Sequence, residues 1–233
     1  GTASTMALMT EAMGMMLPGG AAIPAWASDR LRHAEETGTR AVTLAKEKIT
    51  PDQIITQASV DNAMKTLLAI GGSTNGIVHM AAVAGRLGLK VDLDAFDKMG
   101  REVPTLVNLK PNGAYYMEDL WKAGGLTTIL REIEDLLNLD CPTVNGKTLG
   151  ENLAAQPPGW DQDVVRTRDE TRQTHDRNAA VAESAQASLQ RLAPRKGLER
   201  AQHRQHRIAL PAQPRHVGRG GCTPRRTRAT RRP

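Results

Sequence analysis

Residues with hydroxyl, amide and imidazole side chains gather in two short segments. The first contains Thr2, Ser4 and Thr5, and the second is the elbow Gly71-Gly72-Ser73-Thr74-Asn75, followed by His79 one helical turn later. Hydroxyl groups and free backbone N–H groups in such segments can bind a carboxylate or a phosphate, above all where a helix begins. From composition alone, the elbow is better explained as a tight turn between two helices. A lone helical histidine is likewise more often a structural residue than a base or a ligand.

The remaining polar residues form no recognisable catalytic or metal-binding set. Several acidic residues lie between positions 92 and 135, but no pair has a metal-ligand spacing, so we expect helix caps and solvent-exposed side chains. Cys141 and Cys222 are too far apart in sequence for a disulfide framework or a zinc site of paired cysteines. We expect Cys141 to be a buried structural residue. From the residues alone, no complete catalytic set is visible in this chain.

The opening stretch, residues 1–24, is predicted to position the first of these segments. It begins as a loop of small residues and then becomes an apolar helix, which ends at Pro18-Gly19-Gly20. The residues that recur at helical spacing are Met6, Met9, Met13 and Leu17. A helix that is apolar nearly all round belongs in the interior of a domain. Its positive N-terminal end would suit an anionic ligand.

Hydrophobic spacing and capping residues predict a helix-rich chain with few strands. The predicted helices are 30–48, interrupted or bent near Gly38-Thr39, and 59–70, 76–87, 92–100, 117–123, 126–138 and 148–155. The helix after Ser59 should bury Val60, Met64, Leu67 and Leu68. A short β run is expected at 105–109, before a turn at 110–113. Few strands joined by glycine-rich turns are typical of part of an α/β domain.

The charge pattern divides the chain at about residue 166. Residues 1–166 carry 15 Lys and Arg against 20 Asp and Glu, which leaves 16 against 5 for residues 167–233. Residues 167–233 also lack aromatic side chains, so we expect a basic tail with little ordered structure. No apolar run is long enough to cross a membrane and no signal-peptide pattern is present. A cytoplasmic protein is expected.

Several motifs in residues 1–166, taken together, resemble the dihydroxy-acid and sugar-acid dehydratases. They are Gly1-Thr-Ala-Ser-Thr-Met6, Glu11-Ala-Met-Gly14, Leu17-Pro18-Gly19, the elbow 71–75 with His79, Lys98-Met-Gly-Arg101, Pro104 to Pro111, Glu118-Asp119, Ala123-Gly-Gly125 and Thr143 to Asn152. The variant Ala21-Ala22-Ile23-Pro24 is more similar to the members that act on aldonic acids. No single motif identifies the family, but their order along the chain does.

This resemblance implies a hydro-lyase that converts a 2,3-dihydroxy acid to a 2-keto-3-deoxy acid. In the family, an iron–sulfur cluster acts as Lewis acid on the departing hydroxyl, and Mg²⁺ binds the substrate carboxylate. The matching motifs imply that the ligands of both groups lie outside this chain, which therefore resembles an N-terminal fragment without turnover of its own. The segments 2–5 and 71–75 with His79 would shape the cluster and substrate pocket. The resemblance also implies a small hydroxy-acid substrate and a homo-oligomeric parent enzyme.

The resemblance ends at about Thr167, where the segment Thr171-Arg-Gln-Thr-His175 replaces a family linker resembling Pro-Val-Lys-Pro-Thr. Codons for these five residues can encode the linker after a shift of one base, so residues 167–233 are expected to be an out-of-frame translation. The basic tail also leaves open a protein that binds nucleic acid through counterion release. It has no interleaved aromatic residues, which argues against specific recognition. A structural fragment without activity is a third possibility.

Overall fold

A computed structural model describes residues 1–157, 160 and 162–171 of the 233-residue chain. Most of the predicted basic tail, residues 172–233, lies outside the described residues. The described helices are α1 (Thr2–Ala12), α2 (Ser28–Glu47), α3 (Pro51–Ile54), α4 (Gln57–Ala69), α5 (Asn75–Arg86), α6 (Leu93–Glu102), α7 (Met117–Lys122), α8 (Gly125–Glu132), the 3₁₀ turn η1 (Glu134–Leu136), α9 (Leu149–Ala155) and α10 (Arg168–Thr171). The helix-rich character predicted from the sequence is confirmed.

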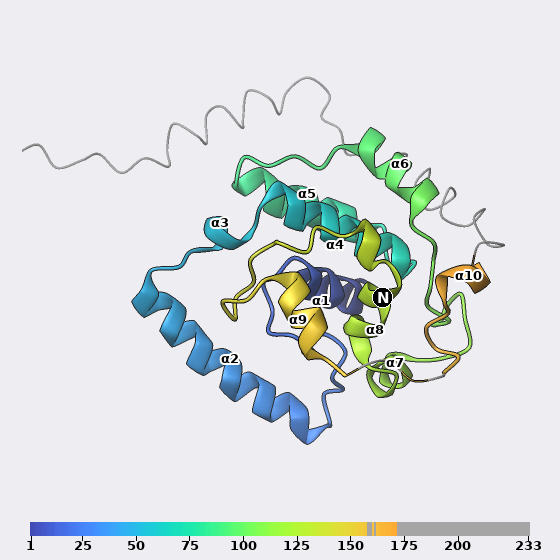
Figure 1. Ribbon diagram of the computed structural model, residues 1–233, viewed down its shortest axis with the longest axis horizontal. Coiled ribbons are helices and arrows are strands. Elements are labelled where there is room, and N and C mark those ends of the chain that lie inside the picture. The colour runs from blue at the N-terminus through green and yellow to red at the C-terminus, as the bar shows by residue number, and fades with distance from the viewer. Residues whose placement is uncertain (158–159, 161, 172–233) are drawn as a thin grey trace, which may run out of the picture. The chain divides into compact units, whose positions relative to one another are not determined.

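The core is built around α4, which packs against α1, α5, α6 and α8 (Figure 1). A capping box starts the helix, since Thr56 Oγ1 accepts from Ser59 N at 3.2 Å and Ser59 Oγ accepts from Thr56 N at 2.9 Å. The side chains predicted to share its apolar face are all buried: Val60, Met64, Leu67 and Leu68. The predicted helix is therefore confirmed to within two residues at each end.

Helix α1 is enclosed by other helices, as its apolar composition predicts. It contacts α4, α5 and α8, and Leu8, Met9 and Ala12 are buried. Its bounds differ from the prediction, because the segment 2–5 is the first turn of the helix and not a loop. The helix also ends at Ala12, earlier than predicted. A series of turns follows from Gly14, which has φ +86°. A Cβ on Gly14 would lie 2.6 Å from the carbonyl oxygen of Pro142.

The predicted β run at 105–109 forms only isolated bridges. Val107 pairs with Val165 in antiparallel fashion, and Leu109 pairs with Tyr115. Backbone hydrogen bonds join Asn108 N to Val164 O and Arg166 N to Leu106 O, both at 2.8 Å. Within the described residues no longer strand is present. The extended pairing exists, but it is too short in this part of the chain to make a sheet.

Helix α2 differs from the other long helices because none of its residues is buried. Figure 1 shows it along the edge of the described helices, connected through the loops on either side of it. The predicted interruption near Gly38 is wrong, since α2 is continuous from Ser28 to Glu47. A glycine costs a helix only about 1 kcal/mol relative to alanine, which a 20-residue helix can tolerate.

The packing predicts that the same substitution lowers the stability of the protein on α4 and leaves it almost unchanged on α2. Leu67→Ala removes a side chain with no exposed surface from the core and should lower the free energy of unfolding by about 2–5 kcal/mol. Leu31→Ala on α2 is the matched control, because Leu31 is 76% exposed in the single chain, and should change the unfolding free energy by less than about 0.5 kcal/mol at concentrations where the chain is monomeric. Urea denaturation followed by circular dichroism measures both. Equal losses for the two variants would contradict the assigned core.

Candidate functional site

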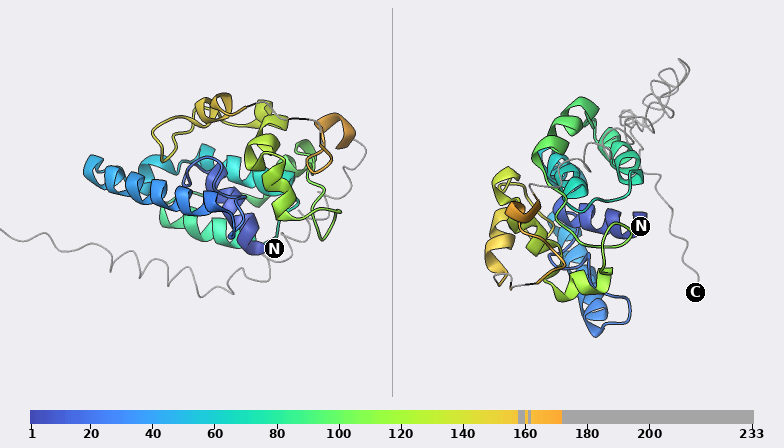
Figure 2. Two further views of the ribbon diagram at one scale, coloured as in Figure 1. Left: turned by 90° about the horizontal axis from the view of Figure 1, so that it is seen from below. Right: turned by 90° about the vertical axis from the view of Figure 1, so that its right-hand side faces the viewer.

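Four of the predicted site residues meet where α1 begins and α5 begins. Thr5 Oγ1 accepts a hydrogen bond from Ser73 N at 3.1 Å and donates one to Gly1 O at 3.1 Å. Thr2 Oγ1 lies 3.0 Å from Ser73 Oγ and accepts from Asn75 Nδ2 at 3.1 Å. We refer to Thr2, Thr5, Ser73 and Asn75 as the hydroxyl cluster. Figure 2 marks the N-terminus of the chain at the start of α1, the helix to which Thr2 and Thr5 belong.

Two glycines of the elbow allow its close approach to α1. Gly71 has φ +51° and ends α4 with the hydrogen bond from Gly72 N to Leu67 O, 3.0 Å long, that is typical of a Schellman motif. A Cβ on Gly72 would lie 2.7 Å from Leu67 Cδ1 and 2.9 Å from Thr5 Cγ2. A residue with a side chain fits there only if Leu67 or Thr5 shifts. The elbow therefore ends one helix, starts the next and packs against α1.

The other predicted site residues take no part in the hydroxyl cluster. Ser4 is half-buried on α1, and Thr74 is the N-cap residue of α5 but makes no side-chain capping bond. The capping role falls to Ser73, whose Oγ accepts from Asn75 N at 3.3 Å. His79 is exposed one turn along α5, and the described residues offer its imidazole no hydrogen bond. The structure gives His79 no place in the site.

The first turn of α1 supplies the free donors of the site. Gly1 is the N-cap residue and provides no side-chain cap, and Thr5 N bonds to Gly1 O at 3.1 Å. In the described part of the chain, the N–H groups of Thr2, Ala3 and Ser4 have no acceptor. Such groups, together with the positive end of the helix dipole, attract a carboxylate or a phosphate. Both hydrogen-bonding functions of the Thr5 hydroxyl are already used within the protein.

Glu11 is a buried carboxylate that sequence reasoning did not single out as a site residue. It is 8% exposed, and its Oε1 accepts from Gly19 N at 2.8 Å while Oε2 accepts from Ala21 N at 2.7 Å. Burial raises its pKa above the ordinary value of 4.5, although these two hydrogen bonds act in the opposite direction. Glu11 therefore holds the turn that follows α1. The signal in the sequence was its position as the only charged residue before Asp29.

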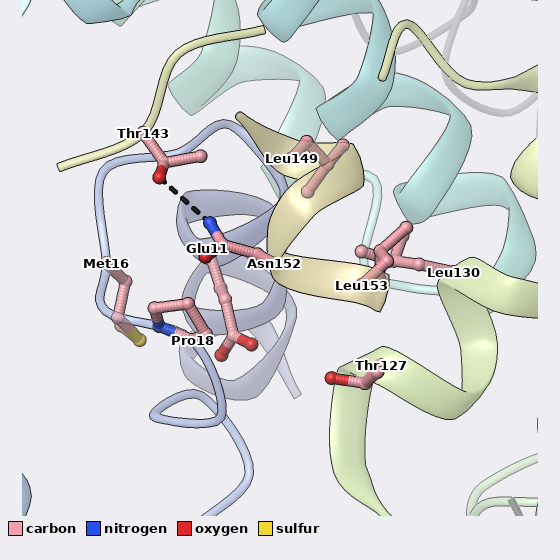
Figure 3. A pocket seen from close by; sticks show the side chains of 9 residues that line it. All are labelled: Glu11, Met16, Pro18, Thr127, Leu130, Thr143, Leu149, Asn152 and Leu153. Carbon is pink, nitrogen blue, oxygen red and sulfur yellow. Dashed lines mark hydrogen bonds between the residues drawn. The ribbon is translucent and has the colours of Figure 1, made fainter. Parts of the chain in front are cut away.

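A cavity of about 20 Å³ lies beside Glu11, which is room for a single water molecule. Figure 3 shows the Glu11 carboxylate next to Pro18, with Thr127 across the space. On the other side Asn152 Nδ2 donates to Thr143 Oγ1 at 2.9 Å. The cavity is much too small for a sugar acid, since ligand pockets measure about 300–1,000 Å³. We therefore assign Glu11 a structural role.

The described residues do not fit an iron–sulfur cluster or a magnesium ion. In this part of the chain no group of three or more His, Cys, Asp or Glu side chains is arranged to hold a metal. Cys141 is buried, and its Sγ lies 3.6 Å from Asn62 Nδ2. Burial raises the pKa of its thiol, which disfavours the thiolate that a metal requires. Cys141 is thus a buried structural residue, as predicted.

Comparison with known proteins supports the family resemblance seen in the sequence and covers most of the described residues. Residues 1–152 match the family model described as dihydroxy-acid/6-phosphogluconate dehydratase N-terminal. The dihydroxy-acid dehydratase of Thermodesulfovibrio yellowstonii is 43% identical over 166 residues, which cover 71% of this chain and 30% of the relative. The L-arabinonate dehydratase of Rhizobium leguminosarum bv. trifolii is 46% identical over 157 residues, 66% of this chain and 27% of the relative.

A third relative, the L-arabonate dehydratase of Azospirillum brasilense, is 44% identical over 166 residues, 70% of this chain and 28% of the relative. The chain thus spans less than a third of the length of these curated relatives. Their names divide between dihydroxy-acid dehydratase and L-arabinonate or L-arabonate dehydratase at nearly equal identity. Among the described residues, no helix has both the length and the apolar character that a membrane crossing requires.

The close approach of the elbow to α1 predicts different effects of alanine at two glycines. Gly72→Ala places a Cβ against Leu67 and Thr5 and should lower the free energy of unfolding by about 1–3 kcal/mol. Gly85→Ala, within α5, meets no atom within 4 Å and should raise it by up to about 1 kcal/mol. Urea denaturation of both variants provides the measurement. A Gly72→Ala protein as stable as the Gly85→Ala protein would mean that the elbow does not pack closely against α1.

The raised pKa of Glu11 predicts a pH dependence of stability. Because folding favours the protonated carboxyl, this contribution is complete below the unfolded pKa of about 4.5 and is lost as the pH rises through the raised folded pKa. Glu11→Gln cannot titrate, so the difference in unfolding free energy between wild type and variant should shrink as the pH rises through that window. Denaturation from pH 4 to about 8 measures it. A difference that grows with pH would show a depressed pKa instead.

Proposed function

Because the chain belongs to the dihydroxy-acid/6-phosphogluconate dehydratase family through residues 1–152, we propose that it is part of a hydro-lyase. The reaction would remove water from a 2,3-dihydroxy acid or a sugar acid and give a 2-keto-3-deoxy acid. The names of the relatives at 43–46% identity support a hydroxy-acid substrate of one of these two kinds. The variant at residues 21–24 favours an aldonic acid.

The residues of this chain would bind and orient the substrate. The observation that carries this proposal is the pairing of the first turn of α1 with the elbow through the hydroxyl cluster. The free N–H groups of Thr2, Ala3 and Ser4 supply donors and a positive dipole end for the substrate carboxylate. The hydrogen bonds from Thr2 and Thr5 to Ser73 fix the direction in which these groups point.

The catalytic groups would come from residues other than those described. An iron–sulfur cluster and Mg²⁺, which the resemblance implies, need ligands that the described residues do not provide. None of the hydroxyl-cluster residues is assigned an acid, base or nucleophile role, because their hydroxyl and amide groups are held in hydrogen bonds to one another. The extended segments 105–109 and 164–166 are the point at which the proposed α/β domain would continue into a sheet.

Binding of a hydroxy acid tests this role. In ¹⁵N-labelled chain, L-arabinonate or 2,3-dihydroxyisovalerate should shift the backbone amide resonances of residues 2–5 and 73–75, because the carboxylate approaches their N–H groups. Arabinitol, which lacks the carboxylate, should not. Ser73→Ala removes a shared partner of Thr2 and Asn75 and should weaken the response, whereas Thr37→Ala on exposed α2 should leave it unchanged.

Two outcomes would contradict the proposal. Equal shifts with arabinonate and arabinitol would show that the carboxylate is not recognised at the start of α1. Formation of keto acid by the chain itself, after reconstitution with iron, sulfide and Mg²⁺, would show that the catalytic groups are present in it.

A further inference from the structure

Helix α2 presents an apolar surface away from the helices that it accompanies. The residues on this surface are Leu31, Ala34, Gly38, Ala41, Val42 and Ala45, and every one of them is exposed. Leu31 and Val42 are exposed by 76% and 56%. We call these six residues the apolar stripe. A helix that only covers its own core would bury such a stripe.

The side of α2 that contacts the rest of the described chain is mostly polar, with Leu44 as a half-buried apolar residue among the polar ones. Arg30 donates from Nη2 to the carbonyl oxygen of Ile23, and Arg40 donates from Nε to that of Val144. Between them, the ring of His33 lies against Gly20. The usual arrangement of an amphipathic helix is thus reversed. The stripe needs a partner that the described residues do not supply.

The spacing of the stripe suits a second helix. Leu31, Ala34, Gly38, Ala41 and Ala45 follow one another at alternating steps of three and four residues, which is the a/d repeat of a coiled coil. Alanine and glycine at these positions let two helix axes approach closely. A Cβ on Gly38 would meet no atom within 4 Å. The hole at Gly38 is therefore open to a side chain of a partner helix.

Charges beside the stripe make it complementary to itself. Glu35 and Lys46 are eleven residues apart, close to three helical turns, so they border the same side of the stripe. Neither forms an ion pair within the described residues, whereas other charged residues of α2 do. If two copies of α2 run antiparallel with Gly38 facing the partner's Ala41, then Glu35 and the partner's Lys46 are offset by about 3 Å along the axis.

We propose that two copies of this chain associate through an antiparallel pair of α2 helices. The two-fold axis forms each contact twice, so Ala34 faces the partner's Ala45 and both Glu35–Lys46 pairs form. Val42 enters the space beside the partner's Gly38. Antiparallel packing also places the positive end of each helix dipole beside the negative end of the other. The surface is separate from the hydroxyl cluster and does not depend on the proposed function.

Sedimentation equilibrium of the full chain tests the proposal first. The wild-type chain should be a concentration-dependent dimer, and Ala41→Glu should weaken it about a hundredfold or more, because it buries a carboxylate twice. Ala154→Glu is the matched control, since Ala154 is also exposed on a helix, and should leave the dimer intact. Circular dichroism should show unchanged helix content for both variants.

Charge reversal then tests the antiparallel register. Glu35→Lys and Lys46→Glu should each weaken the dimer about five- to tenfold. The double variant should recover the wild-type affinity, and a mixture of the two single variants should form heterodimers in preference to homodimers. A wild-type chain that stays monomeric at all concentrations, an Ala41→Glu dimer of wild-type affinity, or a double variant no tighter than the single ones would each overturn the proposal.

Discussion

The packing of α1 against α4 is the interaction on which the rest of the described structure depends. Met9 of α1 and Leu67 of α4 have no exposed surface. Helices α5, α6 and α8 each contact α4, so all of them are positioned relative to this pair. The contact is close because the elbow between α4 and α5 has glycine where a Cβ would meet Thr5 and Leu67. Separation of α1 from α4 would therefore remove both the core and the candidate site.

The same packing determines what the hydroxyl cluster can do. Thr5 is 5% exposed and its hydroxyl group both donates and accepts within the protein, so it serves as a structural connection. Thr2 and Asn75 lie nearer the surface and complete the network. The groups left for a ligand are backbone N–H groups at the start of α1. A site of this kind recognises charge and shape, because a backbone donor cannot transfer a proton at neutral pH.

Elements with local signals could be predicted from the sequence, and those that depend on distant residues could not. Asp92 and Thr148 cap their helices through bonds to the next few residues, which a sequence pattern can reveal. The prediction began α4 at Ser59 and so missed its cap, Thr56. The two segments of the hydroxyl cluster were both recognised, but their meeting depends on helix packing. The partner of the β run, residues 164–166, comes more than fifty positions later, so the local pattern could not show that the pairing would be limited to isolated bridges. His79 was included for its residue type and for its place after the elbow in the family motif, and it is exposed.

Helices α1 and α2 show that periodicity identifies the faces of a helix without telling which face is buried. Helix α1 carries its single carboxylate, Glu11, inward, because two backbone N–H groups eight and ten residues later meet it there. Helix α2 carries an apolar stripe outward, because Arg30 and Arg40 find carbonyl acceptors on the inner side. In both helices the orientation is decided by hydrogen bonds to segments outside the helix. Both orientations follow from one requirement, that polar groups inside a protein must be paired. The buried carboxyl group of Glu11 has its partners, and α2 turns its apolar face outward because its arginines have theirs.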